Sequence, residues 1–146
     1  MTQNRMPVDI SIRTDIKDGK QRERHTMEAS GEVLWRGDMV VLKFREPREE
    51  NEAGTDQTMQ YRDGRLSVRR EGDVTMNQRF IEGASTEGTY NSQAGPMHMM
   101  TKTKELTCDW DAAAGAGVIR LVYVLTLQGS ETGTYTMKVT FEEGTP

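Results

Sequence analysis

The chain has a single cysteine, Cys108, and no long apolar run. One cysteine cannot form an intramolecular disulfide, which fits a reducing compartment and predicts a cytoplasmic protein. Residues 1–10 lack the apolar stretch of a signal peptide, so no export signal is expected. Nowhere does the chain approach the roughly 20 consecutive apolar residues that span a bilayer, so we predict no association with a membrane.

The chain also lacks a large excess of positive or negative charge. The 19 basic and 23 acidic residues leave a net charge of −4, and the isoelectric point lies near 5.3. Nucleic acid is therefore not expected as a partner, because binding to the phosphate backbone depends on a basic surface. The one basic stretch, residues 17–24, also contains Asp18 and Glu23, and we interpret it as the solvated face of a hairpin.

Apolar residues make up only 34% of the chain, and the mean hydropathy is −0.74. They recur at regular spacing, however, which argues against disorder. A chain of 146 residues without internal repeats or low-complexity tracts is expected to form one domain, residues 1–146, with a core of its own.

Alternation of apolar and polar residues dominates the sequence. Val8, Ile10 and Ile12 alternate with polar neighbours, which predicts a half-buried strand that ends in a turn at residues 18–19. Further strands are predicted at 21–33, 39–46, 58–61, 66–68, 74–80, 87–91, 96–107, 118–127 and 134–141. Arg62-Asp63-Gly64 is a hairpin signal between two of them. We expect residues 1–5 to be a flexible tail, residues 47–56 a mobile loop and residues 111–117 a turn.

Strands at this spacing, without any segment of helical periodicity, form a sandwich or a barrel. The connections are nearly all of hairpin length, which favours an up-and-down order. Closing that order into a barrel removes the exposed edges of the sheet. We therefore predict an all-β fold, a single closed antiparallel barrel of about eight to ten strands.

The segment Val118–Leu127 is apolar on both faces. Ile119 and Leu121 lie on one face, whereas Val122 and Val124 lie on the other. A strand of this kind is usually covered on its outer side by a helix, a loop or another subunit. A homodimer through Val118–Leu127 is therefore one prediction.

Signatures of common active sites are missing from the sequence: a P-loop, a nucleophile elbow and paired CxxC motifs. No catalytic residue is assigned, and an enzyme is the least favoured class of function. Residues 97–100, Met-His-Met-Met, resemble a soft-metal site, but alternate side chains of a strand point to opposite faces and cannot close on one ion. We predict neither a metal nor a cofactor, and we expect Cys108 to be a buried, unreactive thiol.

Two charged residues share a strand face with apolar side chains. Arg70 lies on the face of Val68, and Glu46 lies on the face of Phe44, so both charges are expected to point into the barrel or its rim. A buried charge is costly unless it is paired. One hypothesis is an ion pair that closes the end of the barrel. The other makes Arg70 an anchor for a ligand carboxylate or phosphate, which its planar fork can bind with two hydrogen bonds.

Three tyrosines complete the set of candidate ligand-binding residues with Arg70 and Glu46. Tyr61, Tyr90 and Tyr123 either contribute hydroxyl groups to a cavity or fill the core with their O–H groups satisfied.

A longer series of residues occurs in order along the chain: Phe44-Arg45-Glu46, Arg70-Glu71-Gly72, Met76, Phe80, Gly83, Tyr90, Gly95, Thr101, Thr103, Leu121, Tyr123, Leu125 and Gly133. In order and spacing this series resembles the YwiB-like family of uncharacterised bacterial proteins, from about Met6 to Phe141. The resemblance implies a calycin-like barrel, the architecture of lipocalins and fatty-acid-binding proteins. It implies no established activity.

The leading hypothesis for function is a non-catalytic barrel that binds a small, partly apolar or anionic ligand. It depends on the barrel and on the inward-facing Arg70, together with fold-level analogy. The alternative is an interaction or scaffold protein that acts as a homodimer.

Overall fold

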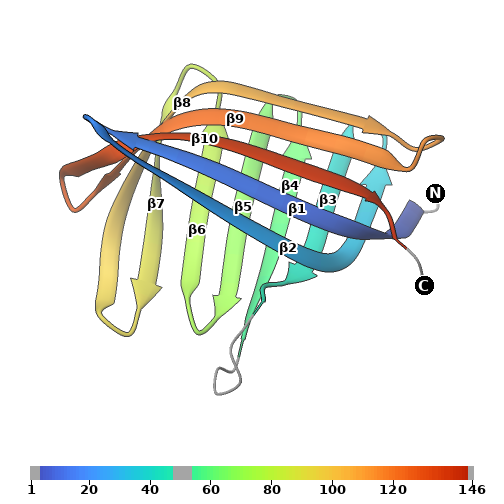
Figure 1. The fold of residues 1–146 in the computed structure, drawn as a ribbon, viewed down its shortest axis with the longest axis horizontal. Helices are drawn as coiled ribbons and strands as arrows, with labels where there is room; N and C mark the ends of the chain where they lie inside the picture. The colour runs from blue at the N-terminus through green and yellow to red at the C-terminus, as the bar shows by residue number, and fades with distance from the viewer. Residues whose placement is uncertain (1–3, 48–53, 145–146) are drawn as a thin grey trace.

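The computed structural model describes residues 4–47 and 54–144, which form a closed barrel of ten antiparallel strands (Figure 1). The strands are β1 (Asn4–Asp18), β2 (Gln21–Arg36), β3 (Met39–Arg45), β4 (Thr55–Arg62), β5 (Arg65–Gly72), β6 (Thr75–Ile81), β7 (Ser85–Ser92), β8 (Gly95–Asp111), β9 (Ala116–Leu127) and β10 (Ser130–Glu143). Each strand pairs with the next one along the chain, and β1 closes the barrel by pairing with β10. The predicted all-β, up-and-down barrel is therefore confirmed. These same residues include no helix long and apolar enough to cross a membrane.

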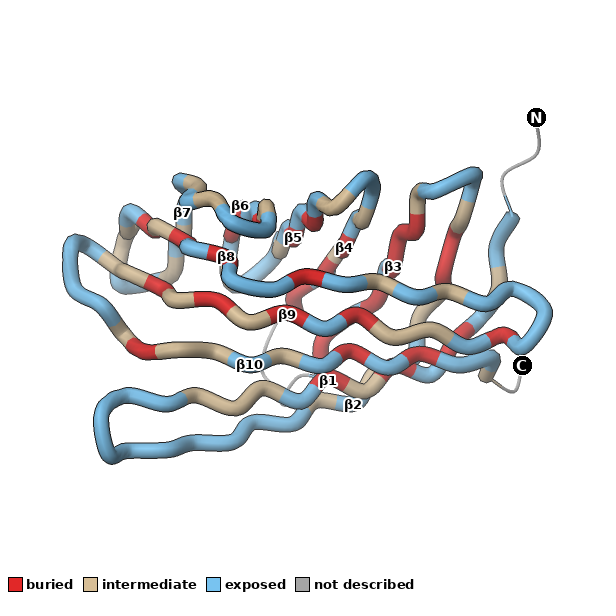
Figure 2. The backbone as a smooth tube through the Cα atoms, turned by 90° about the horizontal axis from the view of Figure 1, so that it is seen from above, coloured by how far each residue is buried: buried red, intermediate tan, exposed pale blue. Residues whose placement is uncertain are grey.

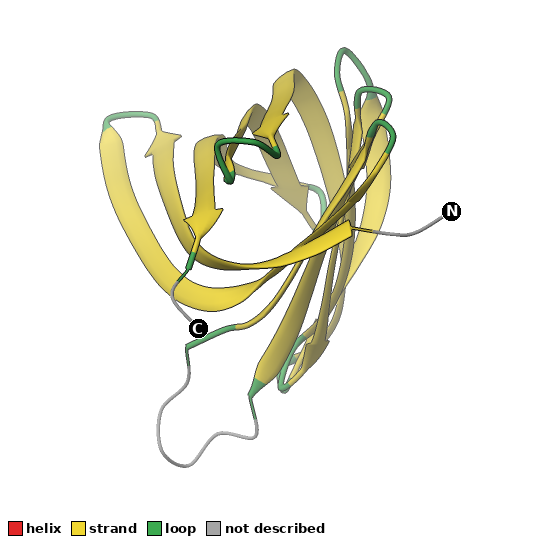
Figure 3. Ribbon diagram, turned by 90° about the vertical axis from the view of Figure 1, so that its right-hand side faces the viewer, coloured by secondary structure: helices red, strands yellow, loops and turns green. Residues whose placement is uncertain are grey.

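The strands fall into two groups by length. β1, β2, β8, β9 and β10 have 12 to 17 residues each, whereas β3 to β7 have 7 or 8. Figure 1 shows the long strands crossing in front of the short ones, and Figure 3 shows the sheet curling around an interior. Two strand groups that cross in this way enclose the space between them.

The hairpin turns follow the residue types at their tips. Asp63 and Gly64 join β4 to β5 and both have positive φ, 49° and 75°. Two positive φ values in succession make a turn whose twist matches that of the flanking strands, and Asp-Gly is favoured there. The turn signal at residues 62–64 therefore predicted this hairpin correctly.

Several boundaries differ from those expected. β1 already includes Asn4 and Arg5, which pair with Trp35 and Leu34 of β2, so the expected flexible tail at 1–5 is wrong for these two residues. Likewise Thr55 and residue 56 belong to β4, not to the loop predicted at 47–56. The side chains at these strand ends are polar and so gave no apolar alternation to read, whereas backbone pairing does not depend on them. Pro47 and Gly54 lie outside any strand, as predicted. Residues 1–3 and 48–53 lie outside the described residues.

Exposure along the backbone follows the alternation (Figure 2). Figure 2 also shows that the tip of the β1–β2 hairpin is exposed on both strands, in agreement with the solvated hairpin face expected for residues 17–24. Side chains fill only one end of the barrel interior, the end that carries the β2–β3 and β8–β9 turns.

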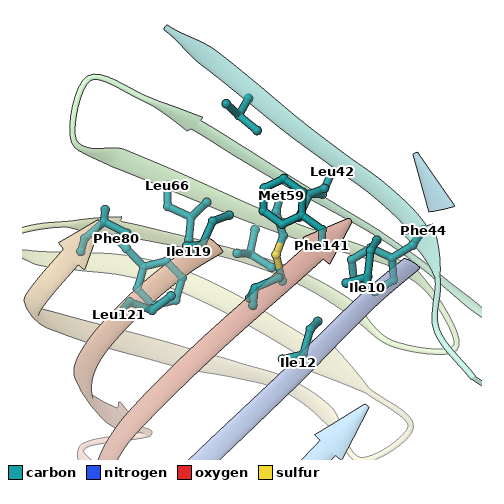
Figure 4. Close-up of a cluster of buried hydrophobic side chains, with 14 of the residues drawn as sticks. Ile10, Ile12, Leu42, Phe44, Met59, Leu66, Phe80, Ile119, Leu121 and Phe141 are labelled. Carbon is teal, nitrogen blue, oxygen red and sulfur yellow. The ribbon is translucent and has the colours of Figure 1, made fainter. Parts of the chain in front are cut away.

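The filled end of the barrel is a core of aromatic and aliphatic side chains. Trp110 stacks on Phe141, with 5.5 Å between the ring centroids, and its centroid lies 5.1 Å from that of Trp35. Figure 4 shows Phe141 and Ile119 of the long strands meeting side chains from the short strands across the barrel. Each fully buried side chain of this size stabilises the fold by about 1.5–3 kcal/mol.

The outer face of β9 is not covered by another part of the described chain. The principal neighbours of β9 are β8 and β10, which flank it in the sheet. Val118, Val122 and Val124 are half-buried on this face. The expectation of a covering helix or loop is therefore wrong for residues 4–47 and 54–144, because side chains of the flanking strands already shield the valines in part.

Candidate functional site

A cavity of about 610 Å³ occupies the other end of the barrel interior, where the β1–β2, β5–β6 and β9–β10 turns lie. Its apolar lining consists of Ile12, Met27, Met59, Val68, Met76, Phe80, Met99, Leu125, Leu127 and Met137, with the rings of Tyr90, Tyr123 and Tyr135. Its polar lining consists of Thr14, His25, Thr26, Glu46, Gln57, Arg70 and Gln78. His25 and Thr26 are exposed, so the cavity reaches the surface beside them.

The position of the cavity follows from the direction of each strand. In β1, Val8 and Ile10 belong to the core alone, Ile12 belongs to both the core and the cavity lining, and Thr14 lines the cavity. Because neighbouring strands run in opposite directions, β10 contributes its beginning, including Met137, to the cavity and its end to the core. Each wall strand therefore supplies packing at one end and cavity lining at the other.

The apolar wall is built around a group of rings. Tyr123 stacks on Tyr135 with 4.9 Å between the ring centroids and meets Phe80 edge to face at 4.8 Å. The Tyr135 hydroxyl lies 3.0 Å from Oγ1 of Thr132. Burial raises the pKa of Tyr123 well above its usual range, so its phenol stays neutral. Such a wall offers flat apolar surface with few charges.

Three of the polar lining residues, Glu46, Gln57 and Arg70, form a hydrogen-bonded cluster. Arg70 donates from Nε to Oε2 of Glu46 at 2.7 Å and from Nη2 to Oε1 at 2.8 Å. Gln57 donates from Nε2 to Oε2 of the same carboxylate at 2.8 Å. Glu46 and Arg70 therefore form an ion pair, as one of the two hypotheses has it, and both also line the cavity.

Strand register brings the three side chains together. Gln57 of β4 lies opposite Arg70 of β5 in the ladder. Glu46 directly follows β3, and its backbone N–H donates to the carbonyl of Thr55 at 2.9 Å, which extends the pairing of β3 with β4 by one step. This step keeps Glu46 on the inner face, two residues after the buried Phe44.

The ion pair is only partly shielded from solvent. The side chain of Glu46 is 9% exposed and that of Arg70 is 24% exposed. The hydrogen bond with Glu46 raises the pKa of Arg70, burial lowers it, and smaller contributions from the Glu46 charge and the nearby Tyr90 raise it. Arg70 therefore stays charged, and its charge is balanced by a carboxylate in direct contact.

The structure brings together four of the five candidate ligand-binding residues. Arg70, Glu46, Tyr90 and Tyr123 line the cavity. Tyr61 does not. It lies near the other end of β4, between Val40 and Leu66 in the ladder, and packs against the filled core. Parity predicted the correct face for Tyr61, but parity does not tell which end of the barrel a residue occupies.

Sequence reasoning missed part of the lining. Gln57 and Gln78 are buried on the inner face, and Gln78 donates to Oγ1 of Thr101 at 3.0 Å. Tyr135 and five methionines also line the cavity. A count of inward positions along each strand could have identified Gln57, since it precedes the buried Met59 by two residues.

The remaining reactive side chains lie away from the cavity. Cys108 was expected to be buried, but it is only half-buried, at the margin of the core. Partial burial still raises the pKa of its thiol to about 12, with a smaller contribution from Asp109. In β8, Met99 is buried and faces the cavity, whereas His98 is exposed on the opposite face, as the alternation of a strand requires. Within the described ranges, no three side chains of His, Cys, Asp or Glu meet in an arrangement that could hold a metal ion.

Comparison with known proteins agrees with this architecture. The uncharacterized β-barrel protein YwiB of Bacillus subtilis (strain 168) is 29% identical over 140 residues, which cover 95% of each chain. The crystal structure of the YwiB protein from Bacillus subtilis superposes with a TM-score of 0.84 at 26% identity, and the match covers 97% of this chain and 94% of that one. Residues 10–139 match the domain of unknown function DUF1934. The chain therefore belongs to the DUF1934 family and is a homologue of YwiB over nearly its full length.

Proposed function

We propose that this protein binds a small, largely apolar molecule inside its barrel without transforming it. The observation that carries the proposal is the cavity of about 610 Å³, with an apolar wall and one cluster of polar groups. Ligand sites typically measure about 300–1,000 Å³ and combine an apolar lining with a few placed polar groups.

The number of strands supports a cavity of this kind. Barrel diameter grows with strand number, and an interior of about eight strands is just filled by its own side chains. Ten strands enclose more space than the core at the filled end occupies. The surplus lies at the end lined by Arg70 and Glu46.

The lining favours binding over catalysis. Glu46 and Arg70 hold each other in a bidentate contact, and the phenol of Tyr123 is kept neutral by burial. A general acid or base needs a pKa near the working pH and access to the proton that it moves. The wall is better suited to enclosing a molecule than to exchanging protons with it.

Titration with the uncharged fluorophore Nile red tests the proposal. We expect saturable binding at one site. Met137→Trp places a larger side chain in the cavity and should weaken binding at least tenfold, whereas Thr136→Trp, on the exposed outer face of the same strand, should not. Circular dichroism of both variants would verify the fold. Absence of binding by the wild-type protein, or equal weakening by both substitutions, would contradict the proposal.

A homodimer through Val118–Leu127 is a second candidate, favoured by the half-buried valines on the outer face of β9. These valines form a strip only one strand wide. In the register, Val122 lies between Glu105 and Thr136, and Val124 lies between Lys102 and Thr134. Stable interfaces bury about 800 Å² on each partner. Polar and charged residues border the strip, so the argument for a homodimer is weaker than the argument for a ligand in the cavity.

A further inference from the structure

The charged side chains of the cavity wall restrict the class of ligand that the cavity can bind. Apart from His25 at the opening, the charged side chains in the lining are Glu46 and Arg70. They are in direct contact, with N–O distances of 2.7 and 2.8 Å, so they contribute one positive and one negative charge at the same place. The interior is therefore neutral, although it contains an arginine.

Arg70 has hydrogen-bond donors that Glu46 does not use, whereas both carboxylate oxygens of Glu46 are already occupied. Both oxygens of Glu46 already accept hydrogen bonds, from Arg70 and from Gln57. The bidentate contact uses two of the five guanidinium N–H groups of Arg70. The other three are not used by Glu46, and the Arg70 side chain that carries them lines the cavity together with Tyr90. The cluster thus presents donors to a ligand without a net positive charge.

A ligand anion would meet this cluster at a disadvantage. It would bring a second negative charge next to Glu46 inside a partly desolvated wall, and like charges in such a site repel strongly. A neutral oxygen, such as that of an amide, ester or alcohol, can accept from Arg70 and leave the ion pair intact. Burial of a neutral acceptor also requires far less desolvation than burial of a carboxylate.

The remainder of the wall indicates the body of the ligand. Five methionines line the cavity, and their unbranched thioether chains adapt to irregular apolar shapes. Such a wall suits a flexible chain or an uneven ring system better than one rigid shape.

We propose that the barrel selects a neutral molecule with an apolar body and one hydrogen-bond-accepting oxygen, held by Arg70, and that Glu46 excludes carboxylates and phosphates from this position. This inference rests on the proposed function, because it names the class of ligand for the same cavity. Glu46 acts as a specificity-determining residue. Its carboxylate neutralises the guanidinium of Arg70 and repels a ligand anion, and it has no hydrogen-bond donor to offer that anion.

Displacement of Nile red by two molecules of equal length, decanamide and decanoic acid, tests the inference at about pH 8, where the acid is ionised. We expect decanamide to displace the dye from the wild-type protein at a concentration at least tenfold lower than decanoic acid. Glu46→Gln removes the balancing charge and should improve the competition by decanoic acid at least tenfold.

Two controls separate the charge effect from other changes. Glu28→Gln alters an exposed carboxylate outside the cavity and should leave the ratio of the two displacement concentrations unchanged. The double variant Glu46→Gln/Arg70→Gln has no charge at the cluster and should not gain affinity for the acid. Equal displacement by both molecules in the wild-type protein, or an unchanged ratio in folded Glu46→Gln, would overturn the inference while ligand binding itself stands. If the wild-type protein does not bind Nile red, the proposed function itself fails, and the inference fails with it.

Discussion

Glu46 and Arg70 show at the scale of single residues why a charged pair inside a barrel depends on both partners. Desolvation of each charge costs several kcal/mol, and the bidentate contact and the Gln57 amide offset that cost. Removal of one partner leaves the other charge buried without compensation. Replacement of both by apolar groups avoids the cost altogether.

Arg70→Met should lower the free energy of unfolding by about 3 kcal/mol, because the carboxylate of Glu46 stays buried with only Gln57 as a partner. Urea denaturation followed by circular dichroism measures this loss.

Glu46→Leu/Arg70→Met is the matched control for this substitution. The double variant should recover most of the lost stability, since no charge is then left in the wall. A single variant as stable as the wild-type protein would show that the pair is solvated rather than buried.

Cys108 should be unreactive in the folded protein. With the pKa of its thiol raised to about 12, the thiolate that attacks disulfide reagents is about one part in ten thousand at pH 8. We expect the reaction with Ellman's reagent to be at least a hundredfold slower in buffer than in denaturing urea. The folded pKa lies above the unfolded one, so stability is unaffected below about pH 8 and falls as the pH rises from there toward 12.

Thr107→Cys/Cys108→Ala provides the comparison for this prediction, because residue 107 is exposed on the opposite face of β8. This variant should react at the rate of an open thiol without urea. A fast reaction of Cys108 in the folded wild-type protein would contradict its burial.

At the scale of the strand, Gly31 allows β2 and β3 to approach closely. It lies opposite Val8 of β1 and Phe44 of β3, and a Cβ at this position would come within 2.7 Å of the Phe44 Cβ and would also clash with the Lys43 carbonyl. The absence of a side chain is needed here for space, since the φ of Gly31 is not positive. The two strands can therefore follow the sharp curvature of the barrel wall at this point.

Gly31→Ala should lower the free energy of unfolding by about 1–3 kcal/mol, because the added methyl group must push β3 away. Gly37→Ala is the matched control in the neighbouring turn. Its φ is +57°, and a Cβ there meets nothing within 4 Å, so the substitution should cost only about 1 kcal/mol of backbone strain. The denaturant midpoints of the two variants compare these losses. Equal losses of unfolding free energy would contradict a steric role for Gly31.

At the scale of the whole molecule, pairing of β1 with β10 closes the barrel that residues 4–47 and 54–144 form. Residues 8–17 of β1 pair with residues 134–143 of β10 at the far end of the chain. Edges are the usual route by which sheets associate, and closure gives most of β1 and β10 a partner. The outer valine strip of β9 is an apolar feature that remains available to a second copy.

We expect the protein to sediment as a monomer of 16.5 kDa at a concentration of about 20 µM, because the strip is too narrow for a standard interface. Sedimentation velocity gives the answer directly. A dimer that Val122→Lys dissociates would instead support the homodimer as the second candidate function.

Much of the architecture was predictable because strand structure is local. Successive side chains of a strand point to opposite faces, so the alternation of apolar residues predicted the strands. Asp-Gly at residues 63–64 predicted a tight turn. The same parity predicted that Glu46 and Arg70 point inward and either pair or line a cavity. The number of strands and their order followed from hairpin-length connections.

The tertiary structure alone decided where the interior is filled and where it is hollow. Tyr61 and Tyr135 share the inward parity of Tyr90 and Tyr123, yet Tyr61 lies in the core and Tyr135 lines the cavity. The height of a residue along the barrel depends on the tilt and register of all ten strands, which no short stretch of sequence encodes. By itself the sequence therefore determined which side chains face inward, and only the assembled barrel determined which of them surround open space.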